Sequence, residues 1–263
     1  MSVKMSRIIE VMEELAPLHL VEDWDNAGFL AGRHDANIDK ALIALDALDA
    51  VIDEALELNA KAIITHHPII FYPVSRINNS SAEGKRLLRI IENGINVYCA
   101  HSNLDNAIGG INDMLFDIFE LKDKELVCEG RPGVFAGRAG TPKEQIALKD
   151  FAKFIQGKLN LLSAVYCGPE NSIVRKVGVI SGGTAKMTFF KGMLAAGCDT
   201  FITSEIKLDK AQAAMDMNLN LVDATHYGGE VIFAPKLKEY LEPKLPGLEL
   251  IVSQIDGQFI KTT

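Results

Sequence analysis

A strand–helix–strand succession between residues 41 and 65 constrains the fold more than any other feature. Ala41–Leu45 and Lys61–Thr65 are short apolar runs typical of buried strands. Between them, residues 49–59 place apolar side chains on one face at helical spacing. Such a unit builds parallel sheets, whose ligands gather outside the carboxyl ends of the strands. We therefore expect an α/β fold in which the site residues follow strands.

Two adjacent histidines, His66 and His67, directly follow the second strand. Pro68 favours an extended backbone at His67, and neighbouring side chains of extended backbone diverge. The two imidazoles are therefore better arranged to serve two ions lying side by side than to hold one. The alternative is a pair of ordinary polar side chains that form hydrogen bonds at a strand end.

The next expected strand, Ile95–Ala100, is followed by His101 and Asp105. Asp105 is a further candidate ligand, although it could instead cap a helix that we expect to continue through Ile118. His101 lies four residues before Asp105 and is a candidate for moving protons. Its alternative role is that of a buried histidine donating to a backbone carbonyl.

The second half of the chain repeats the alternation of strands and helices. Thr141-Pro142-Lys143-Glu144 predicts a helix start, because Thr141 can cap and Pro142 suits the first helical position. Apolar positions predict helices around residues 148–155, 187–194 and 208–215. Strands are expected at Val134–Gly140, Ala164–Gly168, Lys176–Ser181, Thr200–Thr203 and Leu219–Ala224.

His226 and Glu230 follow the last of these strands. In a helix that starts near Thr225 they lie one turn apart on one face, so both can point at a common centre. Gly228 and Gly229 lie between them, and we expect these glycines to keep the approach uncrowded.

These positions form a candidate set of metal ligands. Three imidazoles and two carboxylates suit zinc, iron, manganese or nickel. Five protein ligands are too many for one catalytic ion with an open position, and they match two divalent ions bridged by a carboxylate and a water. Asp46 and Glu205, which we expect to end neighbouring strands, are candidates for orienting the ligands. The candidate ligands are His66, His67, Asp105, His226 and Glu230.

Composition excludes several classes of protein. A net charge of −8 over 263 residues argues against non-specific binding of nucleic acid. The four cysteines show no paired spacing, so we expect buried free thiols in a reducing compartment. A membrane span and a signal peptide are not expected either, which predicts a cytoplasmic protein. The motifs of P-loop nucleotidases, Rossmann dehydrogenases, serine hydrolases and zincins do not occur.

The only tryptophan, Trp24, lies in a turn-rich passage from Val21 to Gly32. Large aromatic side chains mostly anchor packing, so we expect a structural role for Trp24. A functional loop is the alternative.

Five motifs occur in order along nearly the whole chain: Trp24–Gly28, Ile64–Pro68, Ala100–Asp105, Gly109–Asp113 and His226–Glu230. Together they resemble those of the Nif3-like dinuclear metal-centre family. The resemblance implies the same five ligands, and two interlinked three-layer α/β domains with mixed, largely parallel sheets. It also implies a toroidal homohexamer with its sites facing an interior cavity. We expect residues 1–125 and 226–263 to form the first domain, which carries the metal site, and residues 126–225 to form the second.

Members of this family are often labelled as homologues of a type 2 GTP cyclohydrolase 1. The label implies a hydrolase in which a metal-bridging hydroxide attacks a purine nucleotide ring, such as C8 of GTP, while His101 passes protons. The alternative is a non-catalytic metal-binding assembly that regulates proteins or nucleic acid. One loop departs from the family pattern, with Thr203-Ser204-Glu205 and then Leu208-Asp209 in place of Thr-Gly-Asp/Glu, an aromatic residue and a histidine. The Gly182-Gly183 turn is also slightly off the pattern.

Overall fold

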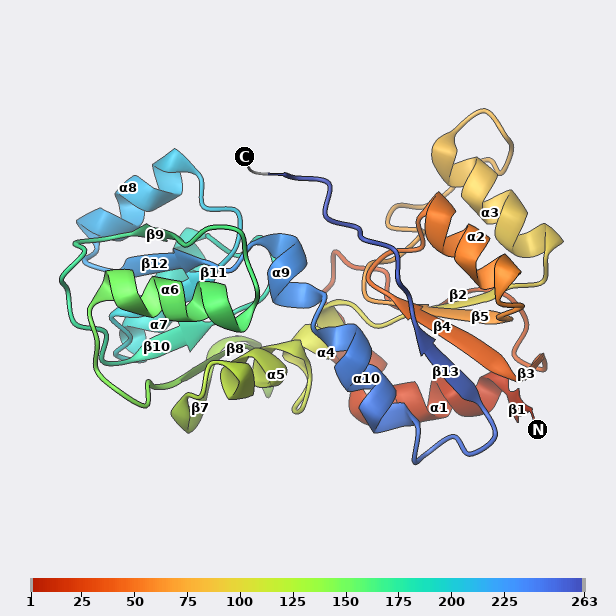
Figure 1. The fold of residues 1–263 in the computed structure, drawn as a ribbon, viewed down its shortest axis with the longest axis horizontal. Coiled ribbons are helices and arrows are strands. Elements are labelled where there is room, and N and C mark those ends of the chain that lie inside the picture. The colour runs from red at the N-terminus through yellow and green to blue at the C-terminus, as the bar shows by residue number, and fades with distance from the viewer. Residues whose placement is uncertain (1, 262–263) are drawn as a thin grey trace. The chain divides into compact units, whose positions relative to one another are not determined.

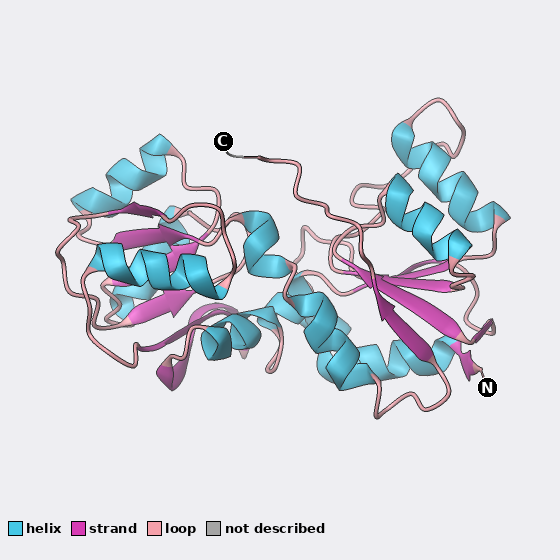
Figure 2. Cartoon of the chain, viewed as in Figure 1, coloured by secondary structure: helices cyan, strands magenta, loops and turns pink. Residues whose placement is uncertain are grey.

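The computed structural model describes residues 2–261, which divide into two compact units of alternating helices and strands (Figure 2). Unit 1 contains the chain up to Ile108 together with Phe233–Phe259, and unit 2 contains Gly109–Ile232. The limits expected from the sequence lie at residues 125 and 225. His226 and Glu230, expected in the same domain as His66, are part of unit 2.

Unit 1 is built on a five-stranded sheet in the order β13-β4-β5-β6-β2 (Figure 1). Its first four strands run parallel, and β2 pairs with β6 in the antiparallel direction. Helix α2, Asp49–Glu57, connects β4 to β5, so the expected strand–helix–strand unit is confirmed. The strands are β2 (Gly28–Ala31), β4 (Lys40–Ala44), β5 (Ala62–Thr65), β6 (Asn96–Cys99) and β13 (Glu249–Val252).

Helices cover both faces of this sheet. α2 and α3 (Ala82–Glu92) lie on one face, and α1 (Met5–Leu15) and α10 (Phe233–Leu241) lie on the other (Figure 1). Every residue of β5 is buried, as expected for a strand packed on both sides. The smaller elements of the unit are β1 (Val3–Lys4), η1 (Leu18–Leu20), β3 (Asn37–Ile38) and α4 (Ser102–Asn106).

Unit 2 contains a six-stranded mixed sheet in the order β7-β8-β10-β11-β12-β9. The central strands β10, β11 and β12 are parallel, and the other three join in the antiparallel direction. The strands are β7 (Lys122–Arg131), β8 (Val134–Thr141), β9 (Val165–Cys167), β10 (Val177–Val179), β11 (Thr200–Thr203) and β12 (Asn220–Asp223).

Two glycines of β8 show that this sheet is also covered on both faces. A Cβ at Gly137 would lie 3.0 Å from Met193 of α7, and one at Gly140 would lie 2.5 Å from Phe116 of α5. Because residues three apart in a strand face opposite sides, α7 and α5 lie on opposite faces. The expected α/β class with mixed sheets is therefore confirmed. The helices are α5 (Ile111–Ile118), α6 (Leu148–Lys158), α7 (Met187–Ala195), α8 (Leu208–Asp216) and α9 (His226–Glu230).

Two expected helices differ from those observed. Thr141 does not start a helix; it ends β8, its hydroxyl donates to Asp123 at 2.8 Å, and α6 begins only at Leu148. The single helix expected from Asp105 to Ile118 is broken into α4 and α5, and Gly109 has a left-handed backbone at the break. Among residues 2–261, no helix has both the length and the apolar character that a membrane crossing requires.

Candidate metal centre

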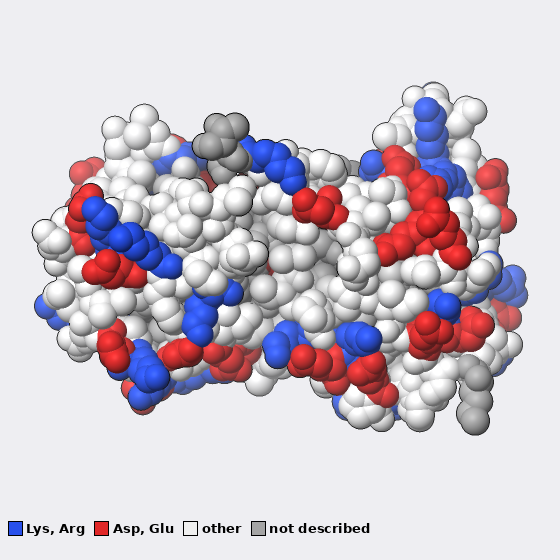
Figure 3. Space-filling view, viewed as in Figure 1, with Lys and Arg blue, Asp and Glu red and all other residues white. Residues whose placement is uncertain are grey.

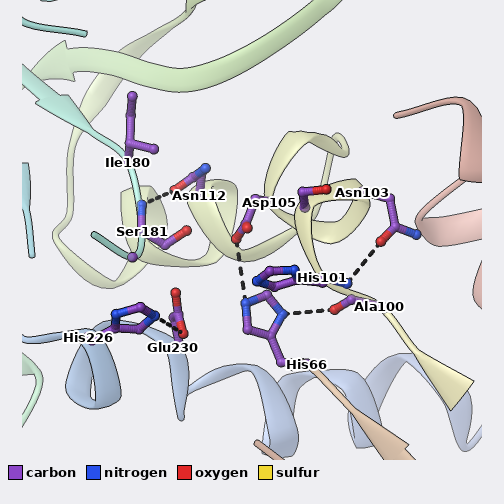
Figure 4. A network of polar contacts seen from close by, with 12 residues as sticks. His66, Ala100, His101, Asn103, Asp105, Asn112, Ile180, Ser181, His226 and Glu230 are labelled. Carbon is purple, nitrogen blue, oxygen red and sulfur yellow. Dashed lines mark hydrogen bonds and ion pairs between the residues drawn. The ribbon is translucent and has the colours of Figure 1, made fainter. Parts of the chain in front are cut away.

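His66 is fully buried at the end of β5 in unit 1. Its Nδ1 donates to the carbonyl oxygen of Ala100 at 2.8 Å (Figure 4). Because a carbonyl oxygen can only accept, this bond fixes the proton on Nδ1 and the lone pair on Nε2. The Nε2 atom lies 3.9 Å from a carboxylate oxygen of Asp105. His66 and Asp105 thus present a nitrogen lone pair and a carboxylate to the same point.

His67 has the same tautomer as His66, but its acceptor is a carboxylate and not a backbone carbonyl. Its Nδ1 donates to Asp46, which follows the adjacent strand β4, at 2.9 Å. The backbone amides of His66 and His67 both donate to the carbonyl of Leu45, at 3.2 and 2.9 Å. The backbone is thereby held at the point where the two imidazoles diverge. The expected orienting contact of Asp46 is confirmed.

His101 belongs to the same cluster. The metal-binding atoms that His66, His67 and His101 can offer lie within 4.8 Å of one another. Nδ1 of His101 donates to Asp25 at 2.7 Å, so its expected alternative, donation to a backbone carbonyl, is wrong. His66 makes that kind of contact instead. The lone pair on Nε2 allows His101 either to accept a proton or to bind an ion.

Asp25 is a further residue of this cluster, and the sequence alone did not indicate it. Its side chain is fully buried, and its second oxygen accepts from the amide of Ser102 at 3.1 Å and from the Ser102 hydroxyl. Burial raises the pKa of Asp25, but the bonds from His101 and Ser102 outweigh this effect and lower the pKa to about 2. The carboxylate is therefore ionised beside His101. In the sequence, Asp25 stands next to Trp24 in a turn-rich passage, which favours a local turn and does not indicate a contact with His101.

Trp24 does not anchor the core, and that expectation is wrong. The residue is 58% exposed. Its ring lies edge-on to His101, with 5.8 Å between ring centroids.

In unit 2, His226 lies between two carboxylates. Its Nδ1 donates to Glu205 at 2.8 Å, and its Nε2 lies 3.2 Å from the buried Glu230 (Figure 4). The expected spacing of His226 and Glu230 over one turn of α9 is confirmed. A neutral ring that donates through Nδ1 would turn its Nε2 lone pair toward the Glu230 carboxylate. Either a second proton or a cation relieves that repulsion.

Unusual backbone conformations surround this pair. Glu205 and Thr225 have φ values of +58° and +54°, which non-glycine residues rarely adopt. The Thr225 hydroxyl caps α9 by accepting from the amide of Gly228 at 3.0 Å. Such outliers cost folding free energy and cluster at functional sites. Their position before His226 and at its carboxylate partner supports a functional role for α9.

Glycines make room here at Gly228 and, unexpectedly, at Gly182 and Gly183. A Cβ at Gly228 would meet Leu161 at 2.4 Å, and one at Gly229 would make only ordinary contacts. A Cβ at Gly182, whose φ is +71°, would lie 2.9 Å from the Glu230 carboxylate, and one at Gly183 would lie 2.7 Å from that of Glu205. The Gly182-Gly183 turn therefore accommodates both carboxylates.

The candidate residues fall into two groups. Within unit 1 the structure brings together His66, His67, His101 and Asp105, with Asp46 and Asp25 behind them. Within unit 2 it brings together His226, Glu230 and Glu205. Asp46 follows β4 and Glu205 follows β11 of the other sheet, so the expectation that they end neighbouring strands is wrong. The orienting contact expected of Glu205 is confirmed.

Known proteins resemble this chain over most of its length. A family model described as Duf34/NIF3 (NGG1p interacting factor 3) matches residues 3–258. A protein of Clostridium acetobutylicum named GTP cyclohydrolase 1 type 2 homolog is 33% identical over 261 residues, which cover 97% of each chain. A protein of the same name from Methanocaldococcus jannaschii is 31% identical over 252 residues, covering 94% of this chain and 98% of that protein.

Solved structures show the same fold. A hypothetical protein of Staphylococcus aureus is similar with a TM-score of 0.89 at 25% identity, covering 99% of both chains. Reduced HcgD from Methanocaldococcus jannaschii has a TM-score of 0.84 at 28% identity, covering 97% of this chain and 99% of that one. The resemblance inferred from the motifs is therefore confirmed, and the chain belongs to the Duf34/NIF3 family.

Proposed function

We propose that this protein is a hydrolase that depends on two divalent ions, with His66, His67, Asp105, His226 and Glu230 as their ligands. The proposal rests on which ring nitrogen carries the proton in each imidazole. His66, His67 and His226 each donate Nδ1 to an oxygen acceptor, which leaves Nε2 as the ligand atom. This arrangement is typical of metal-binding histidines, whose second nitrogen is held by a carbonyl or a carboxylate.

The residues fit a divalent ion of the first transition series. Imidazole and carboxylate ligands without sulfur suit zinc, iron, manganese or nickel. Glu230 is buried and lies 3.2 Å from Nε2 of His226, so the two side chains can offer a carboxylate oxygen and an imidazole nitrogen to one cation.

The proposed substrate is a purine nucleotide such as GTP, as the names of the relatives suggest. Two divalent ions held by His66, His67, Asp105, His226 and Glu230 would supply a nucleophilic water at neutral pH and polarise the group under attack. His101 accepts a proton at Nε2 during the attack and returns it to the leaving group. Asp25 holds the His101 ring through Nδ1 and stabilises its protonated form, since the Asp25 carboxylate is ionised.

A second candidate function is a non-catalytic metal-binding assembly that contacts other proteins. The family description, NGG1p interacting factor 3, favours this candidate. A nucleic-acid partner has less support, since the face drawn in Figure 3 shows Lys and Arg side chains interspersed with Asp and Glu. In either case we propose a homohexamer, which light scattering on the purified protein tests.

Metal analysis combined with a turnover assay tests the proposed function. Protein purified without oxygen should contain two transition-metal ions per chain and convert GTP to a ring-opened product. His67→Ala should lose metal and activity, whereas His19→Ala, at an exposed histidine of the same unit, should retain both. If protein loaded with zinc, iron or manganese yields no product from GTP and His67→Ala behaves identically, the cyclohydrolase reaction is excluded.

A further inference from the structure

Three aromatic side chains of unit 1 form a continuous surface beside His101. Trp24 is 58% exposed, Tyr72 is 75% exposed, and Phe71 is half-buried between them. The ring centroids of Trp24 and Phe71 are 6.2 Å apart, and those of Phe71 and Tyr72 are 4.8 Å apart. Trp24 and Phe71 lie 5.8 and 6.4 Å from the His101 ring. We call Trp24, Phe71 and Tyr72 the aromatic platform.

The backbone beneath the platform is fixed by polar contacts. Asp25, which follows Trp24, is buried and bonded to His101 and Ser102. Asn26 donates its side-chain amide to the carbonyl of Ile70, which precedes Phe71, at 2.5 Å. The loops that carry Trp24 and Phe71 are therefore tied to each other and to the histidine cluster. Exposed aromatic surface on a rigid support is pre-organised for binding, because little conformational entropy remains to be lost.

We propose that the aromatic platform stacks on the purine ring of the substrate and holds it beside His101. The inference rests on the proposed function for its choice of a purine, but not on turnover. Aromatic side chains bind flat heteroaromatic rings by stacking, which requires no particular pattern of hydrogen bonds. A ring on the platform would lie next to the imidazoles that the reaction uses.

A second protein surface is a poorer occupant. Because Trp24 and Phe71 contact the His101 ring, a protein laid over them would also cover the histidine cluster. The ring planes of Trp24 and Phe71 are inclined by 39° and those of Phe71 and Tyr72 by 86°, so a single flat ring would stack on one of these side chains and meet another at its edge. A ligand of that size would leave the histidine cluster open to it. Large exposed aromatic surface next to a polar cluster is typical of ligand sites.

The sole tryptophan makes the proposal directly testable, since Trp24 is the only source of tryptophan fluorescence. Metal-loaded protein is titrated with GTP, and with inorganic triphosphate as a probe that lacks the ring. GTP should change the Trp24 emission saturably, and triphosphate should not. Phe71→Leu should weaken GTP affinity on the order of ten-fold by calorimetry. Phe71→Tyr, which keeps the ring, and Leu162→Ala, at an exposed residue of unit 2, should leave it unchanged.

Metal content and thermal unfolding are measured for every variant, so that a folding defect is recognised. Equal GTP affinity for Phe71→Leu and the wild type would overturn the proposal, as would a Trp24 emission that GTP does not alter. If Trp24→Ser changed the oligomeric state and left the GTP affinity unchanged, the platform would be a subunit interface, and the proposal of purine binding would be overturned. Saturable, ring-dependent binding without product would support the platform while the proposed reaction fails.

Discussion

The Nδ1–H group of His67 donates to the carboxylate of Asp46 at 2.9 Å. Asp46 follows β4 and His67 follows the adjacent parallel strand β5, so a side chain beyond one strand orients the imidazole beyond the next. The side chains of both residues are partly exposed, at 25% for His67 and 33% for Asp46. The contact fixes which nitrogen of His67 is available at the candidate metal centre.

Replacing Asp46 should weaken metal binding without unfolding the protein. Asp46→Asn keeps an acceptor for Nδ1 but removes the negative charge that makes His67 a stronger ligand. We expect metal affinity to fall by about 10- to 100-fold, measured by competition with a chromogenic chelator. Asp53→Asn is the matched control, because Asp53 is an exposed carboxylate of α2 paired with Arg89. Equal metal affinity in both variants would contradict a role for Asp46 at the centre.

His101 and His66 should respond differently to the same substitution. His101→Gln removes the proposed proton carrier and should lower turnover of GTP by about 10²- to 10⁴-fold with metal content retained. His66→Gln should lose metal as well as turnover. Metal analysis and rate measurements on the same samples separate the two. Loss of metal in His101→Gln would show that His101 is a ligand.

Gly182 should be required for the position of Glu230. A methyl group at residue 182 would lie 2.9 Å from the Glu230 carboxylate, so Gly182→Ala should reduce metal content. Gly197→Ala is a sharp control, because Gly197 has a similar φ of +78° and no atom within 4 Å of the added Cβ. Both variants carry the same kind of backbone strain, and we expect only Gly182→Ala to lose metal.

Asp113 should contribute to the stability of unit 2 in a pH-dependent manner. Its carboxylate lies 2.8 Å from the buried Arg138 and 2.9 Å from Lys124. Burial raises the pKa of Asp113, but the bonds from Arg138 and Lys124 outweigh burial and lower it. A lowered pKa in the folded state means that the stabilisation is complete above the unfolded carboxyl pKa of about 3.9 and is lost as the pH falls through the folded value.

Urea unfolding of Asp113→Asn at a series of pH values tests this contribution. At neutral pH we expect the free energy of unfolding to fall by about 3–5 kcal/mol, because the buried Arg138 loses its carboxylate. The decrease in stability toward acid pH should also become shallower than in the wild type. Asp117→Asn, at a carboxylate whose side chain is 73% exposed, should change the free energy by less than about 1 kcal/mol.

The four cysteines should react slowly in the native protein. All four are free; Cys99 and Cys198 are buried, and Cys128 and Cys167 are partly buried. Burial raises the pKa of Cys128 to about 11 and that of Cys198 to about 12, so few thiolates form near neutral pH. A thiol-reactive dye should label the protein slowly until denaturant is added, and then at four positions. Rapid labelling of native protein would contradict this.

Much of the fold could be predicted from the sequence because its signals are local. The strands β4, β5 and β6 are short, mainly apolar runs. His66 and His67 follow β5 and His101 follows β6, as expected. The helix start expected at Thr141 lies at Leu148 instead, because the local capping pattern competes with pairing of β8 to β7, which lies earlier in the chain. Strand β7 was not expected for the same reason, since it depends on pairing with β8 and not on a local sequence pattern.

The site was less predictable where it depends on contacts between distant residues. His226 and Glu230 were indicated by their position after an expected strand and by their spacing over one helical turn. The pairing of Asp25 with His101 joins residues 76 positions apart, and nothing local to Asp25 indicates it. The exposure of Trp24 was missed for a related reason, since a sequence shows that a side chain is apolar but not that its backbone is held at a surface.

Thr225 carries a consequence beyond the site itself. A β-branched residue at a φ of +54° costs about 1–3 kcal/mol of folding free energy, whereas glycine would adopt that backbone freely and lose only a few tenths as a helix cap. Variants selected for heat resistance alone would therefore accumulate glycine at position 225. The free energy of folding therefore does not account for threonine at position 225, whereas its hydroxyl holds the first turn of the helix that carries His226 and Glu230.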